Sequence, residues 1–262
     1  MPINAPTEEE IHGGVAQLFD RVLIGYPEKL LSALITVDKT MHAGLTLINY
    51  VVDSEMQEIC DFVNGFNANL KQTADKYQQI RLKTLIYCHI LEADLPLTVF
   101  WNLLRILNEE PCDWTFHRVT AKGKTEVCEF TRQKIEEIAR FSSLTHTSIG
   151  SVLNRLWEPG LRNAFSHSQY CWTGDMLRGT NDLSPISRRQ SKSNATGIGY
   201  LFTDVDTLYQ RAQNLLHYFI TCYRLAIKNY KDGNAYKVQD GWVVWDDKAG
   251  WLWEQNARQR DA

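Results

Sequence analysis

The sequence predicts an all-α protein, an up-and-down helical bundle that carries one or two small β-hairpins. Apolar residues recur at steps of three and four along most of the 262 residues, as they do on one face of an α-helix. The clearest stripe spans 205–230, which would form a helix of roughly 38 Å at about 1.5 Å per residue. Two shorter segments flank glycine-containing turns, as the strands of a hairpin do.

Capping residues and prolines mark where individual helices begin. Thr7 and Glu10 form a capping box before the first helix, and Pro27 suits the first turn of the second. Thr203 with Asp206 is expected to cap the long helix in the same way. Apolar stripes place the other helices over 11–22, 27–35, 56–63, 80–93, 96–107, 135–139 and 149–156.

The remaining segments are expected to form two hairpins, a loop and a tail. Residues 114–128 fold back around Ala-Lys-Gly-Lys, and residues 170–177 fold back around Gly-Asp. Residues 179–199 are rich in Ser, Asn, Arg and Gly without periodicity, which indicates a mobile loop. Residues 233–262 form a tail with four tryptophans, and we favour docking onto the same chain over docking onto another subunit. We take residues 1–262 as a single domain.

Composition indicates a globular protein of the cytoplasm. No apolar run approaches the roughly 18 residues that cross a bilayer, so no membrane association is expected. The N-terminus is acidic and contains prolines, unlike a signal peptide. Six cysteines form no Cys-x-x-Cys pair and are expected to be free thiols, and neither a metal nor another cofactor is expected. The net charge of −3 gives no overall attraction to nucleic acid, whereas residues 151–199 carry a local balance of 6 − 3 = +3.

The most informative segment is 161–170, Leu-Arg-Asn-Ala-Phe-Ser-His-Ser-Gln-Tyr, which places an arginine, an amide and an imidazole within six residues. Arg162 keeps its charge and offers a planar fork to phosphate oxygens. His167 titrates near neutral pH and can accept or donate a proton. Asn163 can hydrogen-bond either the imidazole or the phosphate. Because Pro159 can open a helix, the motif is expected on the first turns of one.

This arrangement resembles the signature of the HEPN superfamily (higher eukaryotes and prokaryotes nucleotide-binding domain): an arginine, a polar residue directly after it, and a histidine a few positions on. The resemblance implies a HEPN-like core over 70–232. Many members are metal-independent ribonucleases that act on RNA and not on DNA. The resemblance therefore implies an endoribonuclease with Arg162, Asn163 and His167 as catalytic residues. It also implies a toxin or phage-defence setting, with an antitoxin or another defence-system protein as a partner.

The spacing within the motif raises a geometric question. Arg162 and His167 are five residues apart, about 140° around an ideal helix, so they cannot lie side by side on one face. A sweep of the long arginine side chain, an irregular helix, or a second copy of the motif would each bring the two groups together. HEPN proteins resemble the third case, since they commonly form homodimers in which two motifs meet in one cleft.

Other residues are expected to support the motif. Glu92 is expected to be the buried partner of an arginine, with Arg162 as one candidate, and to orient its guanidinium. His89 lies three residues before Glu92, so a metal site or an extra acid in the cleft is a weaker alternative. Tyr170 lies three residues after His167, whereas HEPN toxins receive a nucleotide on a tyrosine two residues after theirs, so we favour a packing role. The candidates for substrate binding are Ser166, Tyr170, Arg155 and Arg178.

Other interpretations stay open. A non-catalytic HEPN-like module would bind RNA, a nucleotide or a partner protein through the same cleft. An interaction scaffold would use the Trp-rich tail as its working surface. The Arg-x-x-x-x-His spacing also occurs by chance, in which case Arg162 pairs with a helix carboxylate and His167 caps a helix or packs in the core.

Overall fold

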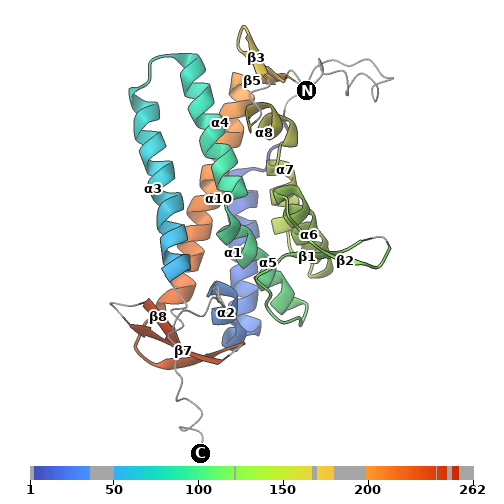
Figure 1. Ribbon diagram of the computed structural model, residues 1–262, viewed down its shortest axis with the longest axis vertical. Helices are drawn as coiled ribbons and strands as arrows, with labels where there is room; N and C mark the ends of the chain where they lie inside the picture. The colour runs from blue at the N-terminus through green and yellow to red at the C-terminus, as the bar shows by residue number, and fades with distance from the viewer. Residues whose placement is uncertain are drawn as a thin grey trace, which may run out of the picture.

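The computed structural model describes residues 3–35, 50–120, 122–166, 170–179, 199–239, 241–246 and 250–253. These residues are mostly helical, with three small antiparallel sheets around the helices (Figure 1). Every helix expected from an apolar stripe is present. The helices are α1 (Glu8–Gly25), α2 (Pro27–Leu34), α3 (Tyr50–Gln72), α4 (Lys76–Glu92), α5 (Asp94–Leu107), α6 (Thr131–Leu144), α7 (Ile149–Leu156), α8 (Pro159–Ser166) and α10 (Phe202–Lys228).

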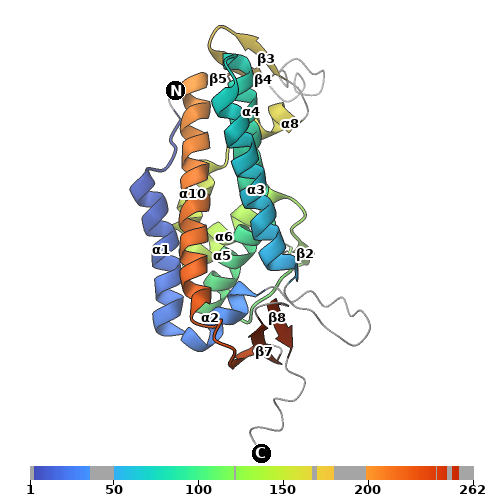
Figure 2. The same ribbon diagram turned by 90° about the vertical axis from the view of Figure 1, so that its left-hand side faces the viewer.

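The long helix α10 packs against both α1, the first helix of the chain, and α4 (Figures 1 and 2). Phe219 on α10 is fully buried, and its ring meets those of Phe19 and Phe100 edge-on at 6.3 and 5.3 Å. Burying such a ring contributes about 1.5–3 kcal/mol. The apolar stripe of α10 therefore belongs to one core that includes α1, α4 and α5.

Two of the three helix starts predicted from capping residues are confirmed. The Glu10 backbone N–H donates to the Thr7 hydroxyl at 3.2 Å, and the Thr7 N–H donates to the Glu10 carboxylate at 2.6 Å. Pro27 opens α2. The predicted box of Thr203 with Asp206 is wrong, since α10 begins earlier and its Asp204 accepts the N–H of Leu201 at 3.0 Å.

The two predicted hairpins are present, and the second gains a strand. Strand β1 (His117–Val119) pairs with β2 (Thr125–Val127), and β3 (Tyr170–Thr173) pairs with β4 (Met176–Gly179). Strand β5 (Gly199–Leu201) then pairs with β4. The two ends of the predicted loop 179–199 are therefore strand residues, and its interior, 180–198, lies outside the described residues.

The Trp-rich tail folds into a third antiparallel sheet, which the sequence did not predict. Its strands are β6 (Ala235–Val238), β7 (Gly241–Asp246) and β8 (Gly250–Trp253). Strand β6 packs on α2, and Val238 and Val243 are buried. Just after β6, the Gln239 backbone N–H donates to the Ser32 hydroxyl at 2.9 Å. Docking of the tail onto its own chain is thus confirmed.

Two further predictions concern the cysteines and membrane-spanning helices. All six cysteines are free thiols, as predicted, and Cys88, Cys112 and Cys128 are buried. Within the described segments, no helix has both the length and the apolar character required to span a membrane.

Candidate functional site

The motif helix α8 is fixed to α4 at its very start. Residue Tyr87 of α4 is fully buried, and its hydroxyl donates to the carbonyl of Leu156 at 2.8 Å. The same hydroxyl accepts the backbone N–H of Glu158 at 2.8 Å. Pro159 then begins α8, as predicted. One tyrosine therefore satisfies the backbone groups left over where α7 ends and α8 starts, which sets the position of Arg162 one turn later.

Arg162 and Glu92 form an ion pair between α8 and the last residue of α4. The Nε of Arg162 donates to the Oε1 of Glu92, so the predicted pairing is confirmed, whereas the predicted burial of Glu92 is wrong. The two side chains are 33% and 31% exposed, so both remain reachable from solvent. The Nη1 of Arg162 also lies 3.4 Å from the amide oxygen of Asn163. Because an arginine carries five N–H donors, donors remain for a bound anion.

A pocket of about 370 Å³ opens beside this ion pair, between α3 and the end of α4. Phe62 and His89 stack across the two helices with their ring centroids 3.7 Å apart. Burial lowers the pKa of His89 below its usual value of 6.5, so the imidazole is neutral at neutral pH. The residues that line the pocket are Glu58, Ile59, Phe62, His89, Glu92 and Ala93.

The weaker metal hypothesis finds no support in the surroundings of His89. Burial, with the nearby charge of Glu92, raises the pKa of the Cys88 thiol to about 12, so Cys88 stays protonated and is a poor metal ligand. In the portion of the chain that is described, no group of three or more His, Cys, Asp or Glu side chains is arranged to hold a metal ion.

The remaining motif residues are placed as follows. His167 lies outside the described residues, together with 168 and 169. Ser166 is exposed at the end of α8. Tyr170 begins β3 and is half-buried, with its ring stacked on Phe165 at 6.1 Å and edge-on to Trp172 at 5.5 Å. The contacts of Tyr170 are those of a packing residue, which is the role that we favoured for it.

The two other predicted substrate-binding arginines lie elsewhere. Arg155 clamps the N-terminal segment, because its guanidinium donates to the Glu10 carboxylate at 2.7 Å and to the Ala5 carbonyl at 3.0 Å. We assign it a structural role. Arg178 is exposed on β4 opposite Cys171, and the alternation of strand residues turns it away from the face that carries Tyr170.

A half-buried carboxyl group beside α8 was not predicted from the sequence. Glu158 is half-buried directly before the helix and accepts the hydroxyl proton of Tyr200 at 3.3 Å. Burial raises the pKa of Glu158, and the charge of Asp204 acts in the same direction. No sequence signal points to this contact, since Tyr200 belongs to the strand β5 that was not predicted.

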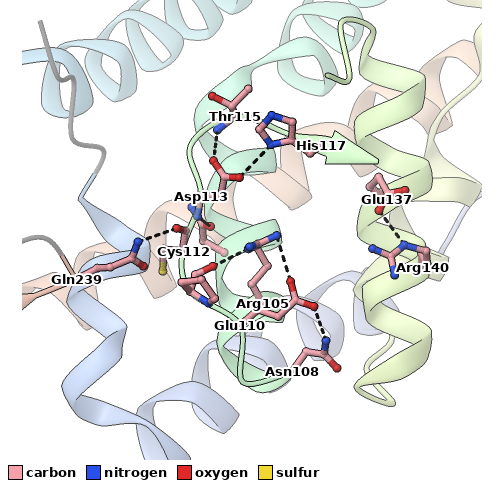
Figure 3. A network of polar contacts seen from close by, with 12 residues as sticks. Arg105, Asn108, Glu110, Cys112, Asp113, Thr115, His117, Glu137, Arg140 and Gln239 are labelled. Atoms are coloured by element: carbon pink, nitrogen blue, oxygen red, sulfur yellow. Dashed lines mark hydrogen bonds and ion pairs between the residues drawn. The ribbon is translucent and has the colours of Figure 1, made fainter. Parts of the chain in front are cut away.

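A second polar cluster occupies the segment between α5 and β1 (Figure 3). Arg105 donates to the Pro111 carbonyl at 2.7 Å and pairs with Glu110 at 3.2 Å. Asp113 approaches the His117 ring nitrogen at 3.0 Å. Because these charged groups form ion pairs and hydrogen bonds within the segment, we assign the cluster a structural role in ordering residues 108–117.

Comparisons with known proteins identify no relative of this chain. No protein-family model, no curated protein and no solved structure matches the chain. The function is therefore inferred from the side chains of the site.

Proposed function

We propose that this protein is a metal-independent endoribonuclease of the HEPN type, with Arg162, Asn163 and His167 as its catalytic residues. The observation that carries the proposal is the Arg162 guanidinium, which is one-third exposed and held through its Nε by Glu92. An arginine oriented by a carboxylate on one edge can present its other nitrogens to a phosphodiester. The motif Arg-Asn-x-x-x-His supplies the proton-transfer group in the same stretch of chain.

The reaction follows from these groups. The 2′-oxygen of a ribose attacks the adjacent phosphorus while the bond from phosphorus to the 5′-oxygen breaks. His167 takes the proton of the 2′-hydroxyl, and an imidazolium delivers a proton to the departing 5′-oxygen. Arg162 stabilises the charge on the non-bridging oxygens. The products are a 2′,3′-cyclic phosphate and a 5′-hydroxyl, so DNA, which lacks the nucleophile, is not a substrate.

Glu92 acts through Arg162 and is a positioning residue. Its carboxylate engages the Nε, the donor on the stem side of the guanidinium, and so leaves the two terminal nitrogens for the phosphate. This arrangement favours bidentate binding of two phosphate oxygens over a single contact. Asn163 lies next to the Nη1 and can hold the same oxygens or the imidazole.

The proposal includes a homodimer in the cytoplasm, in a toxin or phage-defence setting. One imidazole cannot act as base and acid in the same step, whereas two motifs that meet in one cleft supply both groups. A second copy of the chain is therefore the proposed source of the second imidazole.

The test is cleavage of a labelled single-stranded RNA in the presence of EDTA, with the product ends identified by mass. The parent should give 2′,3′-cyclic phosphate ends, and the His167→Ala and Arg162→Ala variants should lose activity by about 100-fold or more. His217→Ala is the control, since His217 is exposed on α10. Equal activity in parent and His167→Ala would refute the catalytic histidine.

A non-catalytic binding module is the second candidate, and the pocket beside Glu92 favours it. A cavity of about 370 Å³ falls within the range of small-ligand sites. Binding of RNA or a nucleotide by the parent, without any cleavage in the same assay, would support this candidate over the nuclease.

A further inference from the structure

The pocket between α3 and α4 has chemistry that the proposed reaction does not use. Its walls combine the stacked rings of Phe62 and His89 with the apolar side chains of Ile59 and Ala93. The charged groups on its lining are the carboxylates of Glu58 and Glu92. Such a lining repels phosphate and suits a planar, uncharged ring that carries N–H donors.

The two carboxylates are not equivalent. Glu92 gives one oxygen to Arg162, which ties the rim of the pocket to the proposed phosphate site. Glu58 is exposed on α3, and among the described residues it forms no ion pair or hydrogen bond. Its two oxygens are therefore available as acceptors, side by side, for a ligand with two adjacent donors.

His89 adds the one donor that the lining otherwise lacks. Its imidazole is neutral at neutral pH because burial lowers its pKa, so it carries one N–H and one lone pair. The ring is pinned against Phe62 at 3.7 Å, so its nitrogens lie in a fixed plane at the pocket wall.

We infer that this pocket is a guanine subsite for the nucleotide whose 3′-phosphate Arg162 holds. The Watson–Crick edge of guanine presents a carbonyl oxygen, then an N–H, then an NH₂ group. Glu58 accepts from the two adjacent donors, and His89 donates to the carbonyl oxygen. The other three bases place a lone pair beside their donor on this edge, which a carboxylate repels.

The inference rests on the proposed function for the position of the phosphate, and it names the substrate class as single-stranded RNA with guanosine before the cleaved bond. Only an unpaired base can enter a pocket by its Watson–Crick edge. The volume of about 370 Å³ holds one base and leaves the ribose at the rim, toward Glu92 and Arg162.

Binding of nucleoside 3′-monophosphates tests the subsite without any cleavage step. Titration calorimetry of the full chain in EDTA compares guanosine, adenosine, cytidine and uridine 3′-monophosphate. We expect guanosine 3′-monophosphate to bind about tenfold more tightly than the others, as a bidentate base contact allows. Glu58→Gln should reduce this preference to less than threefold, while Phe62→Ala should weaken the binding of all four nucleotides.

The matched control is Glu136→Gln, which alters an exposed glutamate on α6 and should retain the parent's preference. Equal affinities of the parent for the four nucleotides would overturn the subsite, as would a guanosine preference that survives Glu58→Gln. Circular dichroism of each variant separates loss of binding from loss of fold.

Failure of the subsite and failure of the nuclease give different results. If the parent binds guanosine 3′-monophosphate selectively but leaves RNA intact, the subsite is supported and the nuclease is refuted. If the parent cleaves RNA after every base and binds the four nucleotides equally, the nuclease is supported and the subsite is refuted. Cleavage confined to the bond after guanosine, and abolished by His167→Ala, supports both.

Discussion

Glu92 on α4 accepts a hydrogen bond from the Nε of Arg162 on α8, across 70 residues of sequence. Both side chains are about one-third exposed, so the ion pair itself contributes little to the free energy of unfolding, about 1 kcal/mol or less. The main effect of the pair is to orient the Arg162 guanidinium. The pair determines which edge of the guanidinium is occupied and which edge is available to an anion.

Replacing Glu92 by glutamine tests this orienting role. The amide retains an acceptor but removes the charge, so we expect kcat for RNA cleavage to fall about tenfold. KM should not rise, because an arginine without its counter-ion attracts phosphate at least as well. Steady-state kinetics on a short RNA measure both constants.

The control for this variant is Glu136→Gln, which breaks the exposed Arg132–Glu136 pair on α6 and should leave both constants unchanged. The Tm of Glu92→Gln should lie no more than about 2–4 °C below that of the parent. An unchanged kcat, or a loss confined to KM, would contradict a positioning role for Glu92.

The hydroxyl of Tyr87 is expected to stabilise the junction of α7 and α8. Tyr87→Phe leaves the Leu156 carbonyl and the Glu158 N–H without their buried partner, at a cost of about 1–3 kcal/mol. For a chain of this size, Tm falls by about 2–4 °C for each kcal/mol. Thermal unfolding followed by circular dichroism measures the change.

Tyr218→Phe is the comparison for this loss, because its hydroxyl donates to Glu8 at the surface at 2.9 Å. We expect it to change the free energy of unfolding by less than about 0.5 kcal/mol. Similar losses in the two variants would show that burial of the Tyr87 hydroxyl has no special importance.

Two glycines are expected to respond to alanine in opposite directions. At Gly150 a Cβ would lie 2.6 Å from the Cα of Ala139 and 2.7 Å from the Cβ of Ser142, where α6 and α7 are in close contact. Since a backbone atom cannot rotate away, Gly150→Ala should destabilise the fold by about 1–3 kcal/mol. At Gly65 in α3 an added Cβ would meet no described atom within 4 Å apart from the adjacent backbone of its own helix, so Gly65→Ala should stabilise the fold by about 0.5–1 kcal/mol.

Urea denaturation of both glycine variants checks these signs. A stabilised Gly150→Ala would mean that α6 and α7 can separate without loss, and a destabilised Gly65→Ala would contradict the helical environment described for α3.

The helices could be predicted because their signal is local. An apolar stripe records the buried face within one segment, so α1, α2 and α10 were identified without knowledge of their partners. Strand β5 has three residues, Gly-Tyr-Leu, which are too few to show an alternation, and it exists through its pairing with Leu177 and its neighbours on β4. The tail strand β7 reads Gly-Trp-Val-Val-Trp-Asp, where bulky residues on both faces conceal the period of two.

The same distinction between local and long-range signals applies to the candidate site. The pairing of Arg162 with Glu92 could be proposed from the sequence because a helix carboxylate is a common partner of an arginine. The contact of Glu158 with Tyr200 could not, since it spans 42 residues and depends on β5. Likewise, the stack of Phe62 on His89 requires the side-by-side placement of α3 and α4, which no local pattern in either helix encodes.

The half-buried Glu158 should make the free energy of unfolding depend on pH in a defined direction. Burial raises the folded-state pKa of Glu158 above its usual value of 4.5, so the folded chain binds this proton more tightly than the unfolded chain does. The stabilising contribution of the protonated carboxyl is complete below pH 4.5 and is lost as pH rises through the folded-state pKa. Glu158→Gln imitates the neutral acid and keeps an acceptor for Tyr200, so its advantage over the parent should grow across that interval and then level off.

Urea denaturation between about pH 4 and pH 8 measures this difference in the free energy of unfolding. Tyr200→Phe gives a second, directional check, because the Tyr200 hydroxyl holds the pKa of Glu158 down. Without that hydroxyl the loss of stability should shift to higher pH. Parallel profiles for the parent and Glu158→Gln would show that Glu158 is hydrated in the folded state, and the raised pKa would then have no physical basis.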